Sequence, residues 1–290
     1  MTNLRIWYDG RMMEDREVGV WAMSPTLHYG VGVFEGIRAY ATPSGPAIFR
    51  LKEHMARMAK GAAVLGLEFD PDACFEGCRK VLADGGLQEA YIRPLAYFAF
   101  GDLSLDIHGP SARTQVAAIP WENHLGEGAR QGVRARISPL RRNAHEAIPP
   151  LKFCGAYVNS VLAKKEAAEA GFQEAIFQDE QGLVVEATGE NVFMVKGGKV
   201  TSVEHPDALP GVTRMTLMEL SGADTRPVSM EELLDADEVF LTGTSGEVSP
   251  VGVLGQRAWT PGPVSTELAD LYQRIVHGKA PDREGWLTRC

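Results

Sequence analysis

The sequence predicts a mixed α+β protein built from two domains. Its 290 residues are 44% hydrophobic, which allows a substantial core, and the length lies between one large domain and two ordinary ones. Short apolar runs bounded by tight turns alternate with a few segments of helical period. The amino-acid composition changes near Pro120, because Trp121 to Gly132 is rich in Gly, Glu and Asn. We therefore expect a small N-terminal α/β domain at 1–119, an interdomain loop at 120–132 and a larger C-terminal domain at 133–290.

The first half is expected to contain strands and two helices. Asp9-Gly10 between apolar runs is typical of a hairpin turn, and Asp70 is a suitable N-cap for a helix that ends at Gly85-Gly86. Pro94 should interrupt the strand that contains it. The expected elements are a hairpin from Ile6 to Met23, helices over 51–65 and 71–82, and a buried strand over 91–100.

The second half is expected to be an antiparallel meander with helices at its ends. Tight turns at Asp179 to Gly182 and at Gly197-Gly198 separate its strands. The expected elements are helices over 157–170, after Gly211 and over 264–276, and strands over 174–178, 183–186, 191–195, 199–203 and 238–241.

Composition limits the class of function. The net charge of −9 and the absence of Lys or Arg runs argue against nucleic acid or an anionic membrane surface as partner. No stretch approaches the roughly 20 apolar residues of a membrane span, and no signal-peptide pattern is present, so we expect a cytoplasmic protein. The scattered cysteines predict neither a disulfide framework nor a metal site, and Cys74 and Cys78 are expected in the core.

Lys152 differs from the other eight lysines, which have charged neighbours or lie in turns and the tail. Apolar residues surround it in the sequence, from Ile148-Pro149-Pro150-Leu151 to Phe153-Cys154-Gly155-Ala156-Tyr157, with no carboxylate within five residues. Desolvation lowers the pKa of an ammonium, and a neutral amine condenses with an aldehyde. This context predicts Schiff-base chemistry, but on its own it is equally typical of a lysine extended along an apolar surface.

Motifs arranged around Lys152 favour the first interpretation. They are His28-Tyr29-Gly30, Val33-Phe34-Glu35-Gly36-Ile37-Arg38, Glu53-His54-Met55-Ala56-Arg57, Tyr91-Ile92-Arg93-Pro94, Pro120-Trp121, Gly189-Glu190-Asn191, Leu209-Pro210-Gly211-Val212-Thr213-Arg214 and Thr242-Gly243-Thr244-Ser245-Gly246-Glu247. In this order and spacing, from about Trp7 to Trp286, the chain closely resembles the branched-chain amino acid aminotransferases. These are fold type IV enzymes that depend on pyridoxal 5'-phosphate.

The resemblance implies a two-domain mixed α/β fold and a role for each cofactor residue. Lys152 would carry pyridoxal phosphate as a Schiff base and act as the general base. Glu186 matches the carboxylate that keeps the pyridine nitrogen protonated, and Tyr157 matches the residue that hydrogen-bonds the phenolic oxygen. Without the resemblance, Glu186 would be interpreted as a strand-edge residue and Tyr157 as a core aromatic.

The phosphate group has a sequence signature of its own. Pro210-Gly211-Val212-Thr213 directly precedes a helical pattern, so the amides of Val212 and Thr213 and the Thr213 hydroxyl can meet an anion at the positive end of that helix. The resemblance adds Arg57, Gly243 and Thr244 as further cofactor ligands, with Glu190 as the carboxylate that orients the arginine.

The resemblance also implies a pocket for branched-chain amino acids and 2-oxo acids. The Tyr91 hydroxyl and the amides of Thr244 and Ser245 would receive the α-carboxylate, while Arg93 and Arg38 would receive the distal carboxylate of 2-oxoglutarate. The apolar pocket would comprise Tyr29, Phe34, Gly36, Trp121 and Tyr157. The product pair would be branched 2-oxo acids and L-glutamate.

Three positions depart from the family pattern. His124 stands where a tyrosine is common, Thr244-Ser245-Gly246 replaces a more usual pair of alanines, and the approach Pro149-Pro150-Leu151 is one residue shorter. His124 lines the pocket in this interpretation and can donate a hydrogen bond to the distal carboxylate. These differences concern the substrate range and leave the cofactor site intact.

Other functions on the same fold are the alternatives. D-amino-acid aminotransferases, R-selective amine transaminases and aminodeoxychorismate lyase share the cofactor site, but Tyr91-Ile92-Arg93 is typical of the branched-chain group. A non-catalytic vitamin B6 binding protein would not need Glu186 or an apolar pocket. Family members borrow active-site residues from a neighbouring subunit, here Leu105 to Ile107, so we expect a homodimer or a multiple of it.

Overall fold

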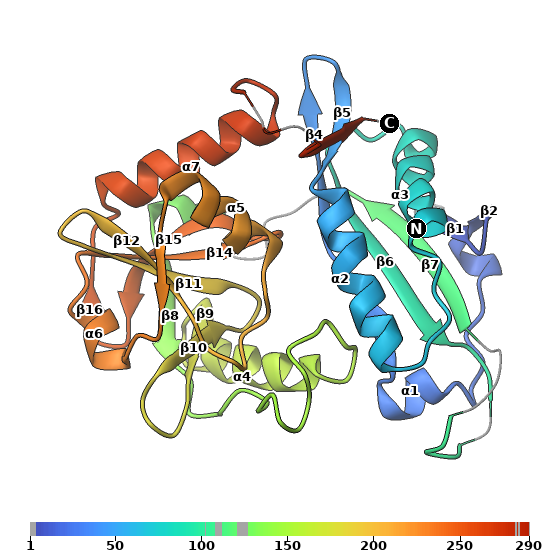
Figure 1. Ribbon diagram of the computed structural model, residues 1–290, viewed down its shortest axis with the longest axis horizontal. Coiled ribbons are helices and arrows are strands. Elements are labelled where there is room, and N and C mark those ends of the chain that lie inside the picture. Colours follow the sequence, from blue (N-terminus) through green and yellow to red (C-terminus); the bar gives the residue numbers. More distant parts are fainter. Residues whose placement is uncertain are drawn as a thin grey trace. The chain divides into compact units, whose positions relative to one another are not determined.

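The computed structural model describes residues 4–101, 103–107, 112–120, 127–281, 283 and 285–289. The chain forms two compact units (Figure 1). The first comprises Met1–Trp121, Leu151–Ala156 and Ile275–Cys290, and the second comprises Glu122–Pro150 and Tyr157–Arg274. Both units combine helices with a β-sheet, as the sequence analysis expects of a mixed α/β protein.

Two helices cover one face of the sheet in the first unit (Figure 1). Among the described residues this sheet has eight strands in the order β17-β5-β4-β6-β7-β1-β2, with β3 paired to β6. Its elements are β1 (Arg5–Tyr8), β2 (Arg11–Glu14), η1 (Asp15–Glu17), α1 (Pro25–Tyr29), β3 (Gly32–Phe34), β4 (Ile37–Thr42), β5 (Gly45–Phe49), α2 (Leu51–Val64), α3 (Pro71–Gly85), β6 (Ala90–Phe98), β7 (Ala112–Ile119) and β17 (Leu287–Arg289).

Local sequence signals explain these elements. Asp9 and Gly10 both have positive φ, of 43° and 91°, which is the backbone twist that a two-residue hairpin turn between β1 and β2 requires. The Asp70 side chain accepts hydrogen bonds from the amides of Asp72 and Ala73, and Gly86 ends α3 in the left-handed conformation. The predicted hairpin turn and helix cap are therefore confirmed.

The core of the first unit lies between the helices and the sheet. Met55, Met58 and Ala62 of α2 are buried against it, as their helical spacing predicts. Cys74 and Cys78 of α3 are fully buried in the same cluster, which confirms their expected packing role.

Strand β6 continues through Pro94, which corrects the predicted interruption. On one side it pairs along its length with β7, and on the other it pairs with β4 up to Ile92 and with β3 from Leu95. The Pro94 carbonyl accepts the Glu35 amide at 3.0 Å on that second side. The missing N–H of proline therefore falls in the gap between two partner strands, where no ladder bond is lost.

The segment Leu151–Ala156 belongs to the first unit, although the sequence-based boundary at 133 assigns it to the C-terminal domain. Its backbone bonds directly to β3 and the turn before it: the amides of Cys154 and Gly155 donate to the carbonyls of Gly32 and Gly30, both at 2.9 Å. Gly30 and Gly155 approach so closely that a Cβ on Gly30 would lie 2.6 Å from the Gly155 Cα. These pairings are long-range in sequence, so hydrophobic patterning does not reveal them.

The second unit contains a larger sheet with helices packed on it. Among the described residues its nine strands run in the order β10-β9-β8-β15-β14-β11-β12-β13, with β16 paired to β15. Its elements are η2 (Glu127–Gln131), β8 (Val133–Ile137), α4 (Tyr157–Glu169), β9 (Glu174–Gln178), β10 (Val184–Ala187), β11 (Asn191–Lys196), β12 (Lys199–Val203), α5 (Val212–Ser221), β13 (Asp224–Arg226), α6 (Met230–Leu234), β14 (Glu238–Gly243), β15 (Glu247–Leu254), β16 (Arg257–Ala258) and α7 (Pro263–Val276), whose last two residues belong to the first unit.

The second sheet is mixed, which corrects the predicted antiparallel meander. The hairpins β9–β10, β11–β12 and β14–β15 are antiparallel, as their tight turns require. However, β8 pairs in parallel with both β9 and β15, and β12 pairs in parallel with β13. The crossover through α4 allows the β8–β9 pair and the crossover through α5 allows the β12–β13 pair, because parallel neighbours need a long connection.

Alanines of α4 pack on this sheet. Ala163 and Ala167 are fully buried against Phe177 of β9 and Val185 of β10. The helix α5 packs against β12 and β14 (Figure 1). Among the helices that the structure describes, none combines the length and the apolar character needed to span a membrane.

Candidate active site

Lys152 lies beside an aromatic residue of the first unit. Its backbone carbonyl accepts the Phe34 amide at 3.2 Å, so the lysine segment and β3 are bonded at this point. Its ammonium nitrogen is 4.8 Å from the centre of the Phe34 ring. The structure thus brings together two residues that the sequence analysis assigns to the site.

Tyr91 and Arg93 project from the same face of β6, because they are two residues apart on a strand. The Arg93 Nη2 donates to the Tyr91 hydroxyl at 3.0 Å, and its guanidinium carbon lies 5.0 Å from the Phe34 ring centre. A Cβ on Gly36 would lie 1.9 Å from the Tyr91 hydroxyl oxygen, so only glycine leaves room there. The Lys152 amine and the Arg93 guanidinium therefore both lie near the Phe34 ring, and the guanidinium also binds the Tyr91 phenol.

Arg38 lies directly opposite Tyr91 in the sheet but is enclosed by other side chains. It is 2% exposed, its guanidinium carbon is 4.5 Å from the Tyr40 ring centre, and its Nη2 is 3.5 Å from a Glu89 carboxylate oxygen. His277 also bonds to Glu89, at 3.3 Å. Arg93 is exposed, so of these two arginines it is the more accessible to a carboxylate.

Glu35, which is fully buried, joins two residues of α2 in a polar cluster. It accepts Arg57 Nε at 2.7 Å on one oxygen and Arg57 Nη2 at 2.8 Å on the other, a bidentate pair. The His54 Nδ1 bonds to the second oxygen at 2.8 Å. His54 and Arg57 are three residues apart and so share one face of the helix. The carboxylate that holds Arg57 is thus Glu35, to which the sequence analysis gave no role, and the orienting role of Glu190 stays a prediction.

Charge in this cluster is fixed. Burial alone would raise the pKa of Glu35, but the Arg57 guanidinium and the hydrogen bonds from Arg57 and His54 hold that pKa far below its ordinary value. Burial lowers the pKa of His54 against the opposing effect of Glu35, so His54 is neutral at pH 7 and its Nδ1–H donates. The Lys152 ammonium also lowers the pKa of His54, as a smaller effect than burial.

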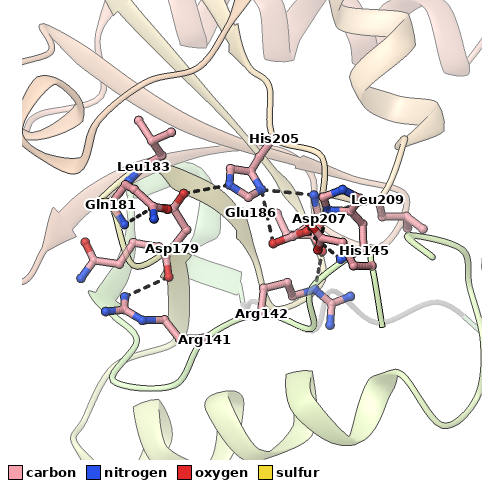
Figure 2. A network of polar contacts seen from close by, with 12 residues as sticks. Arg141, Arg142, His145, Asp179, Gln181, Leu183, Glu186, His205, Asp207 and Leu209 are labelled. Carbon is pink, nitrogen blue, oxygen red and sulfur yellow. Dashed lines mark hydrogen bonds and ion pairs between the residues drawn. The ribbon is translucent and has the colours of Figure 1, made fainter. Parts of the chain in front are cut away.

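In the second unit, Glu186 is a buried carboxylate held by two donors. It lies on β10 and is 4% exposed. One oxygen accepts Arg142 Nε at 2.7 Å and the other accepts the Leu209 amide at 2.9 Å (Figure 2). A carboxylate fixed in this way is suited to bond a protonated heteroaromatic nitrogen.

The start of α5 is suited to bind an anion. Gly211 is its N-cap and provides no side-chain acceptor for the first amides of the helix, those of the buried residues Val212 and Thr213. A Cβ on Gly211 would lie 2.0 Å from the Asn191 side-chain oxygen. Asn191 in turn donates to the Leu209 carbonyl at 2.9 Å, so it fixes the turn that leads into the helix.

The remaining predicted residues of the second unit lie at the ends of its strands and of α4. Glu190 is buried just before β11, and a Cβ on Gly243 would lie 3.0 Å from its Cγ. Thr244 and Ser245 form the turn between β14 and β15, and Tyr157 is the half-buried first residue of α4.

Three predicted residues remain to be placed. In the first unit, the Tyr29 hydroxyl donates to the Leu103 carbonyl at 2.7 Å. Trp121 and His124 lie outside the described residues.

Known proteins are similar to this chain over nearly its whole length. The family of class IV amino-transferases matches residues 32–253. A branched-chain-amino-acid aminotransferase from Pseudomonas aeruginosa is 36% identical over 98% of this chain and 96% of its own length.

This chain belongs to the branched-chain-amino-acid aminotransferases of class IV.

Solved structures of this family have the same fold. The branched-chain amino acid aminotransferase of Escherichia coli has a TM-score of 0.94 at 35% identity, with 99% of each chain covered. The branched-chain amino acid aminotransferase from Thermobaculum terrenum, in its pyridoxal-phosphate form, has a TM-score of 0.90 at 29% identity, with 99% of each chain covered. The predicted family and fold class are therefore confirmed.

Three polar residues that hold predicted site residues in place were not expected from the sequence: Glu35, His54 and Arg142. Glu35 stands alone among apolar residues, which is a signal for a buried carboxylate that needs a partner. The spacing of His54 and Arg57 on one helix face supplies that partner. Arg142 has no comparable signal, because its partner Glu186 is 44 residues away.

Proposed function

We propose that the chain catalyses transamination between branched-chain L-amino acids (leucine, isoleucine and valine) and 2-oxoglutarate, giving branched 2-oxo acids and L-glutamate, with pyridoxal 5'-phosphate as cofactor. Membership of the family over the whole chain supports this activity. The observation that carries the proposal is the position of Lys152 against the Phe34 ring, which Arg93, bonded to Tyr91, also approaches.

The residues present fit this cofactor. The amides at the start of α5 suit its phosphate, because the N-cap Gly211 offers them no side-chain acceptor. Arg57, held charged by Glu35, is a second phosphate ligand. Glu186 suits its pyridine nitrogen, and Lys152 supplies the amine.

Each of these residues has a defined task. When bound, pyridoxal phosphate supplies an electron sink for the negative charge that develops at the substrate α-carbon. Lys152 takes the α-proton at its Nζ, as the general base. Glu186 holds a proton on the pyridine nitrogen, which maintains that sink.

Substrate selection rests on the face of β6. The Tyr91 hydroxyl is a donor for a carboxylate, and the Phe34 ring offers an apolar surface for an aliphatic side chain. Arg93 is a cation for the distal carboxylate of 2-oxoglutarate and already points toward Tyr91. The roles of Tyr157, Glu190, Gly243, Thr244 and Ser245 are proposed from the family motifs alone.

A second copy of the chain is the proposed partner. Apolar residues around α1 are widely exposed in the first unit, with Trp21 at 66%, Leu27 at 65% and Leu105 at 85%. The Trp21 and Phe100 rings are 5.7 Å apart, so this surface, which we call the α1 surface, joins residues 20–29 to 100–101 and 103–105. Soluble monomers rarely expose so many large apolar groups together.

The proposed activity is tested with purified protein, pyridoxal phosphate, L-leucine and 2-oxoglutarate, by measuring glutamate. D-Alanine and R-phenylethylamine are the control donors, and a preference for either would contradict the substrate assignment. Lys152→Ala should abolish both glutamate formation and the long-wavelength absorption band of the bound cofactor. Lys165→Ala, which alters an exposed lysine on α4, should retain both.

A further inference from the structure

A chain of histidines and aspartates runs beside Glu186 in the second unit (Figure 2). The His145 amide and its Nδ1 both donate to one Asp207 oxygen, at 2.8 and 2.6 Å. The Asp207 amide donates to His205 Nδ1 at 3.1 Å, and His205 Nε2 is 3.2 Å from an Asp179 carboxylate oxygen. We call these four residues the Asp207 clamp.

The contacts within the clamp assign its protons. An amide can only donate, so His205 Nδ1 is an acceptor and the ring proton is on Nε2, from which it bonds to Asp179. Asp179 also accepts the amides of Gln181 and Leu183, at 2.9 and 2.8 Å. Burial would raise the pKa of Asp179, but these donated hydrogen bonds lower it, so Asp179 is a charged anchor in the β9–β10 turn.

The clamp connects the two loops that supply the donors of Glu186. Arg142 lies three residues before His145, in the loop that follows β8. Leu209 lies two residues after Asp207, in the loop between β12 and α5. The bonds from His145 to Asp207 therefore join these loops directly, and His205 anchors the second loop to the β9–β10 turn.

Such a connection is needed because both donors lie outside the sheet ladders. Backbone segments without ladder bonds fluctuate more, and side chains on them lose geometry first. His205 and Asp207 have side-chain exposures of only 7% and 13%, so their hydrogen bonds are shielded from competing water. A buried carboxylate keeps its orientation only while its own donors stay in place.

We propose that Asp207, with His145 and His205, is a positioning residue for Glu186. By holding Arg142 and the Leu209 amide in place, the clamp aims the carboxylate at the pyridine nitrogen of the cofactor. The inference rests on the proposed function, because Glu186 has this target only in an enzyme that uses pyridoxal phosphate.

The test compares Asp207→Asn with wild type, alone and in a Glu186→Gln background. Asp207→Asn keeps the shape of the side chain but removes its charge. If Asp207 acts through Glu186, kcat should fall about tenfold while KM for 2-oxoglutarate changes little. In the Glu186→Gln background the same substitution should change kcat less than about twofold, because residues in one network are not additive.

Hydrogen exchange of the apoprotein provides a readout without the cofactor. Asp207→Asn should increase exchange about tenfold in both 138–147 and 204–211. His145→Ala, a milder change at a residue with a 39% exposed side chain, should shift both measurements in the same direction. Asp235→Asn is the matched control, because it removes an exposed carboxylate that pairs with Lys196 elsewhere in the unit.

The outcomes separate the two proposals. Equal losses of kcat in the wild-type and Glu186→Gln backgrounds, or unchanged exchange in both loops, would overturn the positioning role. An inactive wild-type protein with the expected exchange pattern contradicts the proposed function and supports the connection between the loops. If Asp207→Asn does not fold, His145→Ala decides the question by the same criteria.

Discussion

At the scale of single residues, Glu35 controls a charge that the site depends on. It has no exposed surface and pairs with Arg57 in two hydrogen bonds. A buried carboxylate is costly unless a partner compensates its charge, and here the compensation also fixes the arginine. Glu35 therefore contributes both to the stability of the first unit and to the geometry of a proposed phosphate ligand.

Glu35→Gln should weaken both contributions. Removing one charge of a buried pair leaves the Arg57 guanidinium uncompensated, so the free energy of unfolding should fall by about 3 kcal/mol at pH 7. The affinity for pyridoxal phosphate should fall as well, because Arg57 loses its bidentate support. Denaturant unfolding and cofactor titration measure these effects. Glu76→Gln is the control, because it breaks only a surface pair with Arg79.

The same substitution should change the response to acid. The pKa of Glu35 is lower in the folded protein than in the unfolded chain. Its stabilising contribution is therefore present above the unfolded pKa of about 4.3 and is lost as the pH falls through the folded pKa. The stability of the wild type should decline more steeply below about pH 4.3 than that of Glu35→Gln. Parallel curves for the two proteins would contradict the assigned shift.

At the scale of elements, the start of α5 combines an anion site with a tight backbone contact. Gly211 is there because Asn191 occupies the space that a side chain would need. Asn191 uses its amide to hold the Leu209 carbonyl, and the Leu209 amide holds Glu186. One turn therefore supports both the helix amides and the buried carboxylate.

Gly211→Ala should displace this turn. Its Cβ would lie 2.0 Å from the Asn191 oxygen, so the helix start or the asparagine must move. We expect the affinity for pyridoxal phosphate to fall about tenfold, since anion binding at a helix start depends on the direction of its amides. Titration of the apoprotein measures this change. Gly85→Ala in α3, where a Cβ meets only Leu87 atoms at 3.7 Å or more, should leave the affinity unchanged.

At the scale of the whole molecule, the α1 surface predicts self-association. Leu27→Asp places a charge on this surface and should weaken the dimer more than tenfold, with loss of activity at low protein concentration. Analytical ultracentrifugation over a concentration series measures the change. Val64→Asp alters a similarly exposed apolar residue of α2, at 59%, and should leave association intact. A monomeric wild type would contradict the proposed assembly.

Much of the molecule follows from the sequence alone. The hairpin turn at Asp9-Gly10, the cap at Asp70 and the buried faces of α2 and α3 are set by local backbone chemistry and hydrophobic period, which act over a few residues. The family follows as well, because its motifs have specific residues in a specific order. Lys152 can also be singled out from the sequence, because all its near neighbours are apolar.

Tertiary structure decided what depends on distant parts of the chain. The parallel pairs of β8, the continuation of β6 through Pro94 and the attachment of the lysine segment to β3 all join strands that no local pattern connects. The partners of the buried charges could likewise not be predicted from the sequence. Glu35 contacts Arg57, and Glu186 contacts Arg142, only after the chain has folded. A sequence pattern can indicate that a charged residue will be buried and will need a partner of opposite charge. Which residue becomes that partner depends on the three-dimensional path of the backbone.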